Sequence, residues 1–399
     1  MKNWSRGWFV VLLLALTGLC AMAQDLRLQV APPPIAFENW KPVPREDGMA
    51  EFAASFPSAY QTGIAANDRV PLRIFLPEKR PCPVVVILHY WGAQDLRVEQ
   101  NLAEELVSRG VGAVIITLPY HLSRTPPGTR SGDLAIEPDP NKLIAMTEQS
   151  VLDVRRTIDF LVSRPEVDAS RIGVSGVSLG ALVGITTFAV DERISRASFL
   201  LGGVDLAHIL WKSSRLVPQR EVFRRNGYTE GSLRKLLAPI EPLTYLPRKT
   251  GVAFVVGGKF DTVVPGDSTR RLIELMPNAR VLWLDTGHYG GVFVQRRLMR
   301  EVARYFDAEF SGADYVPPKK LVAPTVRLGA VLDGTNGFDI GVGLDIWQFD
   351  SRGQGFATLL GTPRGPQIIL GRRLGQGYSI SLNIAKGGTG LGLFWSIVL

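Results

Sequence analysis

The 399-residue sequence has little cysteine and little histidine. Its cysteines are Cys20 and Cys82, and Cys20 falls in an N-terminal segment that we expect to be removed. The single cysteine left makes no intramolecular disulfide and no cysteine metal cluster. An exported chain without such crosslinks relies on its apolar core, and 46% hydrophobic content supports one of a size that suits an enzyme domain.

Features of nucleic-acid and cofactor binding are also missing. The formal net charge is +8, but the basic residues are dispersed as pairs such as Arg155-Arg156, without an aromatic-interleaved stripe. We expect no nucleic-acid partner, while loose attraction to anionic surfaces fits the charge. Gly257-Gly258-Lys259 lacks the spacing of a phosphate-binding loop, and no metal-ligand pattern occurs. We expect no cofactor and no metal.

The N-terminal apolar run, from Trp8 to Leu19, is too short to span a bilayer comfortably, because about 20 residues are needed. Basic residues precede it, and Ala21-Met22-Ala23 has the small-x-small pattern of a cleavage site. We therefore expect residues 1–23 to be a signal peptide cleaved near Ala23, and a mature chain that is periplasmic or secreted. An uncleaved anchor is the alternative. Lipidation of Cys20 fits less well, because a leucine precedes it.

The middle of the chain alternates strand and helix patterns. Residues 24–49 are rich in proline and predict an extended lead-in. Over residues 50–315, buried strands are expected at 83–89, 112–118, 171–175, 196–201, 251–256 and 281–284, with helices between them. This pattern predicts an α/β fold: a mostly parallel sheet with helices on both faces. Ligands of such sheets bind beyond the carboxyl ends of the strands.

Two segments depart from this pattern. Residues 205–248 predict a polar, helical insertion placed to act as a lid, although a helical excursion that gates nothing explains it equally well. After an expected linker at 316–324, residues 325–399 show alternating runs and glycine turns, which predict a small antiparallel β domain of roughly six strands. Membrane barrels have at least eight strands per chain, so we expect this segment not to close one alone. It remains a candidate for envelope or surface association.

Ser178 is the strongest candidate for a catalytic residue. It lies in Gly176-Val177-Ser178-Leu179-Gly180, between an expected strand and an apolar helix, which is the context that a Gly-x-Ser-x-Gly motif requires. The glycines allow a sharp turn that exposes the serine, and the helix N-terminus favours a developing anion. A structural strand–helix turn is the alternative interpretation. Leu179, the residue after the serine, would supply the first oxyanion N–H.

A serine nucleophile needs a base and an orienting acid. His288 lies just after the sixth strand between glycines, and Asp261 lies after the fifth. The order Ser178, Asp261, His288 is that of the α/β-hydrolase group. Asp205, after the fourth strand, is the competing acid, and Asp285 is too close in sequence to His288 to be preferred.

Four motifs, VVVILHYWG, GVSLG, GGKFDTVVP and DTGHYGG, resemble the α/β-hydrolase superfamily, particularly its dienelactone-hydrolase-like and acetyl-xylan-esterase-like members. The resemblance covers roughly Glu51 to Phe310. It implies a Ser-Asp-His triad and ester or related acyl hydrolysis. The usual His-Gly of the first loop is His89-Tyr90 here. By position Trp91 would give the second oxyanion N–H, although Tyr90 is an alternative.

The sequence therefore predicts an exported serine esterase acting on a small-molecule or carbohydrate ester. Tyr90, Tyr120, His121 and Tyr289 are the candidate substrate-binding residues, and packing at the mouth of the core explains the tyrosines equally well. A prolyl-oligopeptidase-like peptidase or amidase shares the order of the triad. A non-catalytic envelope-binding protein with a vestigial hydrolase fold is the alternative from another class.

Overall fold

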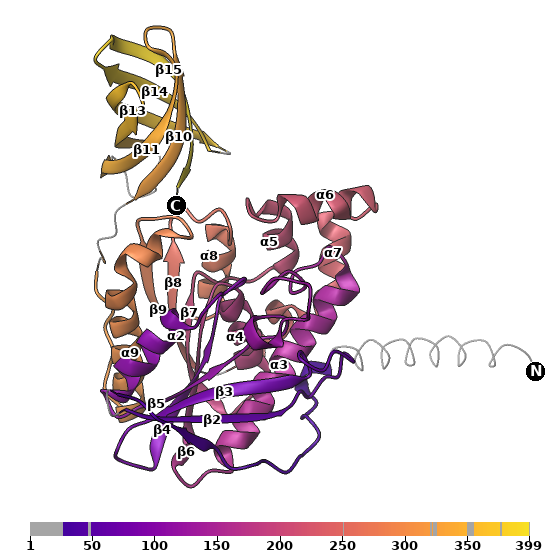
Figure 1. The fold of residues 1–399 in the computed structure, drawn as a ribbon. Helices are drawn as coiled ribbons and strands as arrows, with labels where there is room; N and C mark the ends of the chain where they lie inside the picture. The colour runs from indigo at the N-terminus through magenta and orange to yellow at the C-terminus, as the bar shows by residue number, and fades with distance from the viewer. Residues whose placement is uncertain are drawn as a thin grey trace, which may run out of the picture.

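The computed structural model describes residues 27–46, 49–249, 251–319, 321, 325–348, 355–375 and 377–398. The expected signal peptide and part of the expected linker lie outside these residues. Figure 1 shows an α/β unit followed by a separate C-terminal β unit. The predicted fold class, a mostly parallel sheet with helices and an antiparallel β domain, is confirmed.

A nine-stranded sheet in the order β1-β2-β3-β5-β4-β6-β7-β8-β9 forms the centre of the α/β unit. Its six parallel strands are β4 (Cys82–Leu88), β5 (Gly112–Ile116), β6 (Val167–Val177), β7 (Ile194–Leu200), β8 (Val252–Gly258) and β9 (Arg280–Leu284). These lie close to the six predicted runs. β4 and β5 are apolar throughout because both of their faces are covered, whereas β6 and β7 also contain serine and arginine.

Three antiparallel strands, which the sequence pattern did not predict, extend one edge of this sheet. They are β1 (Lys41–Val43), β2 (Ala50–Pro57) and β3 (Arg69–Leu76), of which β3 pairs with β5. β1 lies in the proline-rich segment that was expected to be an extended lead-in, and a 3-10 turn, η1 (Arg27–Gln29), precedes it.

Helices cover both faces of the sheet and bury two apolar cores. α2 (Arg97–Val107) and α9 (Gln295–Ser311) pack together on one face, while α3 (Pro140–Val162), α4 (Leu179–Val190) and α8 (Gly266–Glu274) cover the other (Figure 1). Successive side chains of β4 alternate between the cores, with Val84 and Val86 in one and Val85 and Ile87 in the other. Among the described residues, no helix is long and apolar enough to cross a membrane.

The segment between β7 and β8 is helical, as the pattern of residues 205–248 indicates. It contains α5 (Leu206–Lys212), α6 (Val217–Arg225) and α7 (Glu230–Leu236), followed by the 3-10 turns η3 (Ala238–Ile240), η4 (Pro242–Thr244) and η5 (Leu246–Arg248). Phe223, Leu233 and Ile240 are buried in the core on the α3 and α4 face. Two further 3-10 turns, η2 (Leu122–Arg124) and η6 (Gly290–Val294), follow β5 and β9.

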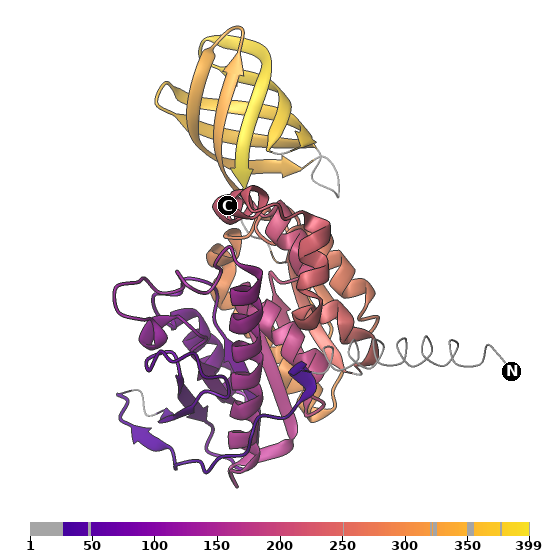
Figure 2. The same cartoon turned by 90° about the vertical axis from the view of Figure 1, so that its right-hand side faces the viewer.

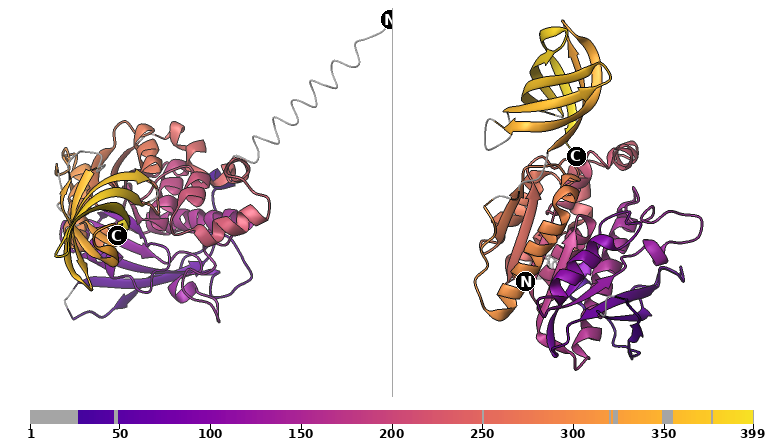
Figure 3. Two further views of the ribbon diagram at one scale, coloured as in Figure 1. Left: turned by 90° about the horizontal axis from the view of Figure 1, so that it is seen from above. Right: turned by 60° about the vertical axis from the view of Figure 1, so that its left-hand side comes forward.

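The C-terminal unit is a closed ring of six antiparallel strands (Figure 2). These are β10 (Val326–Asp333), β11 (Gly337–Gln348), β12 (Gly355–Thr362), β13 (Gly365–Gly375), β14 (Tyr378–Ala385) and β15 (Gly388–Val398). Each strand pairs with the next, and β15 pairs back with β10. The antiparallel strands agree with the sequence pattern, whereas their closure into a barrel was not predicted. Figure 3 gives two further views of both units.

Candidate active site

Ser178 occupies a sharp turn between β6 and α4. It follows the last residue of the strand and directly precedes the first residue of the helix, with φ 54° and ψ −113°. Such a positive φ is unusual for serine and costs about 1–3 kcal/mol unless the surroundings hold it. Here the Ser178 N–H donates to the Leu200 carbonyl of β7 at 2.9 Å. The strand, turn and helix that the motif predicts are therefore present.

Two glycines make this turn possible because neighbouring backbone comes too close for a side chain. A Cβ added at Gly176 would lie 2.2 Å from the Gly180 carbonyl oxygen. A Cβ added at Gly180 would lie 2.3 Å from the carbonyl oxygen of Leu88 in β4. The Gly-x-Ser-x-Gly spacing thus lets α4 start against the ends of β4 and β6.

Ser178, His288 and Asp261 form one hydrogen-bonded chain. The Ser178 Oγ lies 2.9 Å from His288 Nε2, and His288 Nδ1 lies 2.7 Å from Asp261 Oδ2. The backbone N–H groups of Val263 and Val264 donate to Asp261 Oδ1, each at 2.9 Å. Asp261 follows β8 and His288 follows β9, so strands that are neighbours in the sheet bring the acid and the imidazole together.

The two other candidate acids have different partners. Asp205 precedes α5, where its carboxylate accepts from the His208 N–H and from the side chains of Arg234 and Arg271. Asp285 forms an ion pair with Lys259. Among the described residues, the carboxylate that meets the His288 ring is that of Asp261.

His89 and His121 are buried, and each uses both ring nitrogens within the protein. His89 Nε2 accepts from the Leu118 N–H at 3.0 Å, and its Nδ1 lies 2.9 Å from the Tyr90 carbonyl oxygen. His121 Nε2 accepts from the Gly92 N–H, also at 3.0 Å. Burial lowers the pKa of His89 to about 3 and that of His121 to about 4. Both imidazoles are therefore neutral and hold loops in place.

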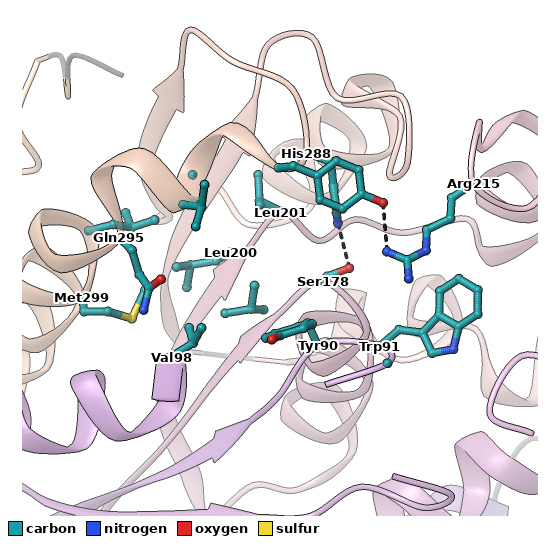
Figure 4. A pocket seen from close by; sticks show the side chains of 16 residues that line it. Tyr90, Trp91, Val98, Ser178, Leu200, Leu201, Arg215, His288, Gln295 and Met299 are labelled. Atoms are coloured by element: carbon teal, nitrogen blue, oxygen red, sulfur yellow. Dashed lines mark hydrogen bonds between the residues drawn. The ribbon is translucent and has the colours of Figure 1, made fainter. Parts of the chain in front are cut away.

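A pocket of about 280 Å³ opens at Ser178 (Figure 4). Tyr90, Trp91 and Tyr289 line it together with Ser178 and His288. Much of the remaining wall is apolar and includes Val98, Leu200, Leu201, Val292, Leu298 and Met299. A site of this kind accepts an apolar group and offers few polar contacts to position it.

Tyr120 and His121, which were expected to contact substrate, are not among the residues that line this pocket. The Tyr120 N–H donates to Asn67 Oδ1 at 2.8 Å, and the Tyr120 backbone has φ 62°. Neither side chain therefore lines the pocket at Ser178, although His121 Nε2 accepts from the N–H of Gly92, which does line it.

Arg215, which is not among the residues predicted from the sequence, reaches the pocket from the helical insertion. Its guanidinium carbon lies 4.4 Å from the centroid of the Trp91 ring, and Nη1 donates to the Tyr289 hydroxyl at 2.9 Å (Figure 4). One arginine thus links the insertion to two loops around Ser178. The sequence carries no signal for this role, because the insertion holds several other arginines and no local pattern distinguishes Arg215 from them.

The oxyanion donors expected from the sequence lie on two elements. Leu179 is the first residue of α4, so its N–H has no acceptor within the helix. Tyr90 and Trp91 line the pocket beyond β4, and the Gly92 N–H is engaged by His121. The Trp91 indole N–H donates to the Gly132 carbonyl at 2.8 Å, which fixes its ring. Within the described ranges, no three acidic, histidine or cysteine side chains gather as metal ligands would.

Comparison with known proteins finds a distant sequence relative. No family model matches the chain. "Putative hydrolase YtaP" of Bacillus subtilis is 28% identical over 200 residues, which are 46% of this chain and 62% of that protein. The chain therefore spans less than two thirds of this relative.

Two solved structures share the fold with low sequence identity. An acetyl xylan esterase from a Paenibacillus species has a TM-score of 0.54 at 20% identity, over 73% of this chain and 93% of its own. Acetyl xylan esterase 1 from a Thermoanaerobacterium species also has a TM-score of 0.54, at 16% identity, over 70% of this chain and 92% of its own. The chain has the α/β-hydrolase fold, as the four sequence motifs predict.

Proposed function

We propose that this chain of the α/β-hydrolase fold is a serine hydrolase that cleaves carboxylic esters through an acyl-enzyme intermediate. One observation carries the proposal: the hydrogen-bonded chain from the Ser178 Oγ through the His288 ring to the Asp261 carboxylate, with links of 2.9 and 2.7 Å. Serine is a weak nucleophile alone, and an adjacent imidazole with a fixed tautomer activates it.

In the first half of the reaction, the Ser178 Oγ attacks the ester carbonyl carbon while its proton passes to His288 Nε2. The Asp261 carboxylate accepts from Nδ1–H and so keeps Nε2 free to take that proton. When the tetrahedral intermediate collapses, the bond to the alcohol oxygen breaks. His288 then gives the proton to the leaving alcohol, and the acyl group remains on Ser178.

In the second half, water attacks the acyl carbon and loses a proton to His288 Nε2. Collapse of this second intermediate releases the carboxylic acid and returns the proton to Ser178. The negative charge that develops on the carbonyl oxygen in both halves would be held by the Leu179 N–H and by a second N–H from Trp91, with Tyr90 as its alternative. Each such donor contributes about 3–4 kcal/mol to stabilising the transition state.

The pocket supports an apolar acyl group larger than acetyl as the substrate part nearest Ser178. Its wall is mostly apolar, and each buried methylene contributes about 0.8 kcal/mol to binding. The two solved structures named above are acetyl xylan esterases, so a carbohydrate ester remains the competing substrate class for this chain. Comparing p-nitrophenyl acetate, butyrate and hexanoate with acetylated sugars separates these classes.

We further infer that the enzyme acts after export. The support is the signal-peptide pattern of residues 1–23, which lie outside the described residues. Mass spectrometry of the protein recovered from its native host should give a chain that begins near Gln24. A chain that retains residues 1–23 would contradict cleavage.

The test of the proposed reaction is the hydrolysis of p-nitrophenyl butyrate by the wild-type chain and by Ser178→Ala. We expect the variant to fold normally and to lose turnover. Ser170→Ala, which removes an exposed hydroxyl from the same strand, is the matched control and should keep full activity. Activity in Ser178→Ala would refute the mechanism. Turnover of a p-nitroanilide but not of the ester would favour an amidase.

A further inference from the structure

The C-terminal barrel has an unusual distribution of side chains. Most of the exposed large apolar residues among the described residues lie on its strands, and every strand contributes some: Leu332, Val342, Leu359, Ile368, Ile380 and Leu391 are examples, with exposed fractions from 37% to 74%. Together, the exposed apolar side chains on β10–β15 form the outer surface of the barrel. A single exposed apolar residue needs no explanation, but a continuous apolar surface indicates a binding partner.

The interior of the barrel holds polar and charged side chains alongside a small apolar cluster. Arg327 is 1% exposed, and its guanidinium donates to both Asp345 oxygens at 2.6 and 2.7 Å. Asp339 Oδ2 accepts from Thr362 Oγ1 at 2.6 Å and from Gln367 Nε2 at 2.9 Å. A barrel surrounded by water has the reverse arrangement, with apolar residues inside and polar residues outside. This distribution of side chains fits an apolar environment better than it fits water.

The backbone of the barrel meets the other requirement of such an environment. β15 pairs with β10, so the ring leaves no edge strand with unpaired N–H and C=O groups. Only helices and closed barrels satisfy their backbone within lipid. Inward glycines let as few as six strands close: a Cβ at Gly329 would lie 2.3 Å from the Phe394 ring, and one at Gly371 would lie 2.3 Å from the Phe356 ring. The expectation that this segment would not close a membrane barrel alone depended only on its number of strands.

We propose that the outer surface inserts into the hydrocarbon core of a phospholipid bilayer and anchors the chain there. The apolar side chains surround the whole ring, whereas a second copy of the chain would cover one sector and leave the others in water. β11, β13 and β15 have 11 or 12 residues, close to the 9–11 that a tilted strand needs to cross a bilayer, whereas β10, β12 and β14 have 8. Figure 2 shows the tilt of the strands around the ring.

Aromatic residues define how the barrel sits in the bilayer. Trp347 lies near the end of β11, Tyr378 begins β14, and Trp395 lies near the end of β15, directly opposite Tyr378. Because the ring is antiparallel, all three lie at the end where β10 enters from the α/β unit. Trp and Tyr gather where lipid meets water. The α/β unit then stays in water at the membrane surface, and export would deliver the chain to such a membrane.

Flotation of the chain from Gln24 onward, which lacks the N-terminal apolar run, with vesicles of phosphatidylethanolamine and phosphatidylglycerol tests this proposal. We expect the wild-type protein to float with the vesicles and to remain bound after washes with high salt and with carbonate at alkaline pH. The double variant Val342→Arg and Leu382→Arg places charges at mid-strand on opposite sides of the ring. It should reduce the floated fraction by roughly tenfold or more, because a charge on a lipid-facing strand is costly at mid-membrane.

A matched double variant and a folding measurement show whether reduced flotation comes from the barrel surface alone. The matched double variant Val162→Arg and Val217→Arg places charges on exposed apolar positions of the α/β unit, and it should float like the wild type. Circular dichroism should show that both double variants are folded. Wild-type protein that stays unbound to vesicles would overturn the proposal. A defined oligomer without lipid, measured by light scattering and abolished by the barrel variant, would overturn it as well, because a second copy would then cover the outer surface.

Discussion

The guanidinium carbon of Arg215 lies 4.4 Å from the centroid of the Trp91 ring, so a residue of the helical insertion covers a loop beside Ser178. A second contact joins the Arg215 guanidinium to the Tyr289 hydroxyl, next to His288. The Arg215 side chain therefore connects the insertion to the mouth of the pocket, where it contacts both Trp91 and Tyr289.

Removing this bridge should widen the mouth. Because a cation over an aromatic ring contributes about 0.5–2 kcal/mol, Arg215→Ala should raise kcat/KM for bulky esters relative to p-nitrophenyl acetate by about threefold. Arg224→Ala removes a similar contact, with Trp211, elsewhere in the insertion and should leave that ratio unchanged. If the two variants have the same ratio as the wild type, Arg215 does not limit access.

Substitutions of Asp261 and Asp205 should show which of the two carboxylates orients His288. Asp261→Asn leaves the shape of the site intact but favours the wrong His288 tautomer, so kcat for p-nitrophenyl butyrate should fall by about 10⁴. Asp205→Asn should lower the unfolding temperature, since Asp205 pairs with Arg234 and Arg271, and should change kcat only slightly. The opposite result would assign the orienting role to Asp205.

A methyl group at Gly180 should prevent the turn around Ser178. The added Cβ would lie 2.3 Å from the Leu88 carbonyl oxygen and 2.6 Å from that of His89, and neither backbone atom is free to move. Gly180→Ala should lower the free energy of unfolding by about 3 kcal/mol or more, as overpacking does. Gly231→Ala, whose Cβ meets no atom nearer than 3.9 Å, should be neutral or slightly stabilising. Equal urea midpoints for the two variants would contradict this packing.

Glu99 should make the stability of the chain depend on pH. The side chain is 1% exposed in α2, its oxygens accept no hydrogen bond from another described residue, and burial raises its pKa to about 7. Between about pH 4.5 and 7 the folded chain keeps the Glu99 proton while the unfolded chain loses it. The free energy of unfolding therefore falls as the pH rises through this range, and the loss is complete above about pH 7.

The stability gained by Glu99→Gln should therefore be larger at pH 8 than at pH 5, by about 2–3 kcal/mol. Urea unfolding at both pH values measures this difference. Glu274→Gln, at an exposed position of α8, is the control. Its free energy of unfolding should differ from that of the wild type by the same amount at pH 5 and at pH 8. If the free energies of unfolding of Glu99→Gln and of the wild type differ by the same amount at both pH values, the Glu99 carboxyl remains charged in the folded chain.

Much of the α/β unit was predictable because its signals are local. β4, β5 and β8 are continuous apolar runs, and Ser178, Asp261 and His288 each follow a parallel strand, at the edge where the ends of these strands meet. Tyr120 and His121 also follow a strand, yet they lie away from the pocket, because contacts with distant residues such as Asn67 turn that loop aside. Arg215 and Glu99 acquire their surroundings from tertiary packing alone, and nothing in their neighbours in sequence indicates it.

The barrel shows a different limit of the sequence. Alternation in YSISLNIA indicates two faces, one with Ser379, Ser381 and Asn383 and the other apolar. Alternation does not say which face is inward, and the common expectation puts the apolar face inside. Here Ser379, Ser381 and Asn383 are buried, while Ile380 is 52% exposed. Only the closure of β15 onto β10 decides which side is enclosed.

The measurement that tests the proposed chemistry most directly is labelling with a fluorophosphonate, followed by mass spectrometry of the peptides. Only a serine activated by a neighbouring base reacts readily with this probe. The account predicts one adduct, on Ser178, in the folded wild-type chain, and none in Ser178→Ala. Folded wild-type protein that takes up no label, or label that persists in Ser178→Ala, would contradict it.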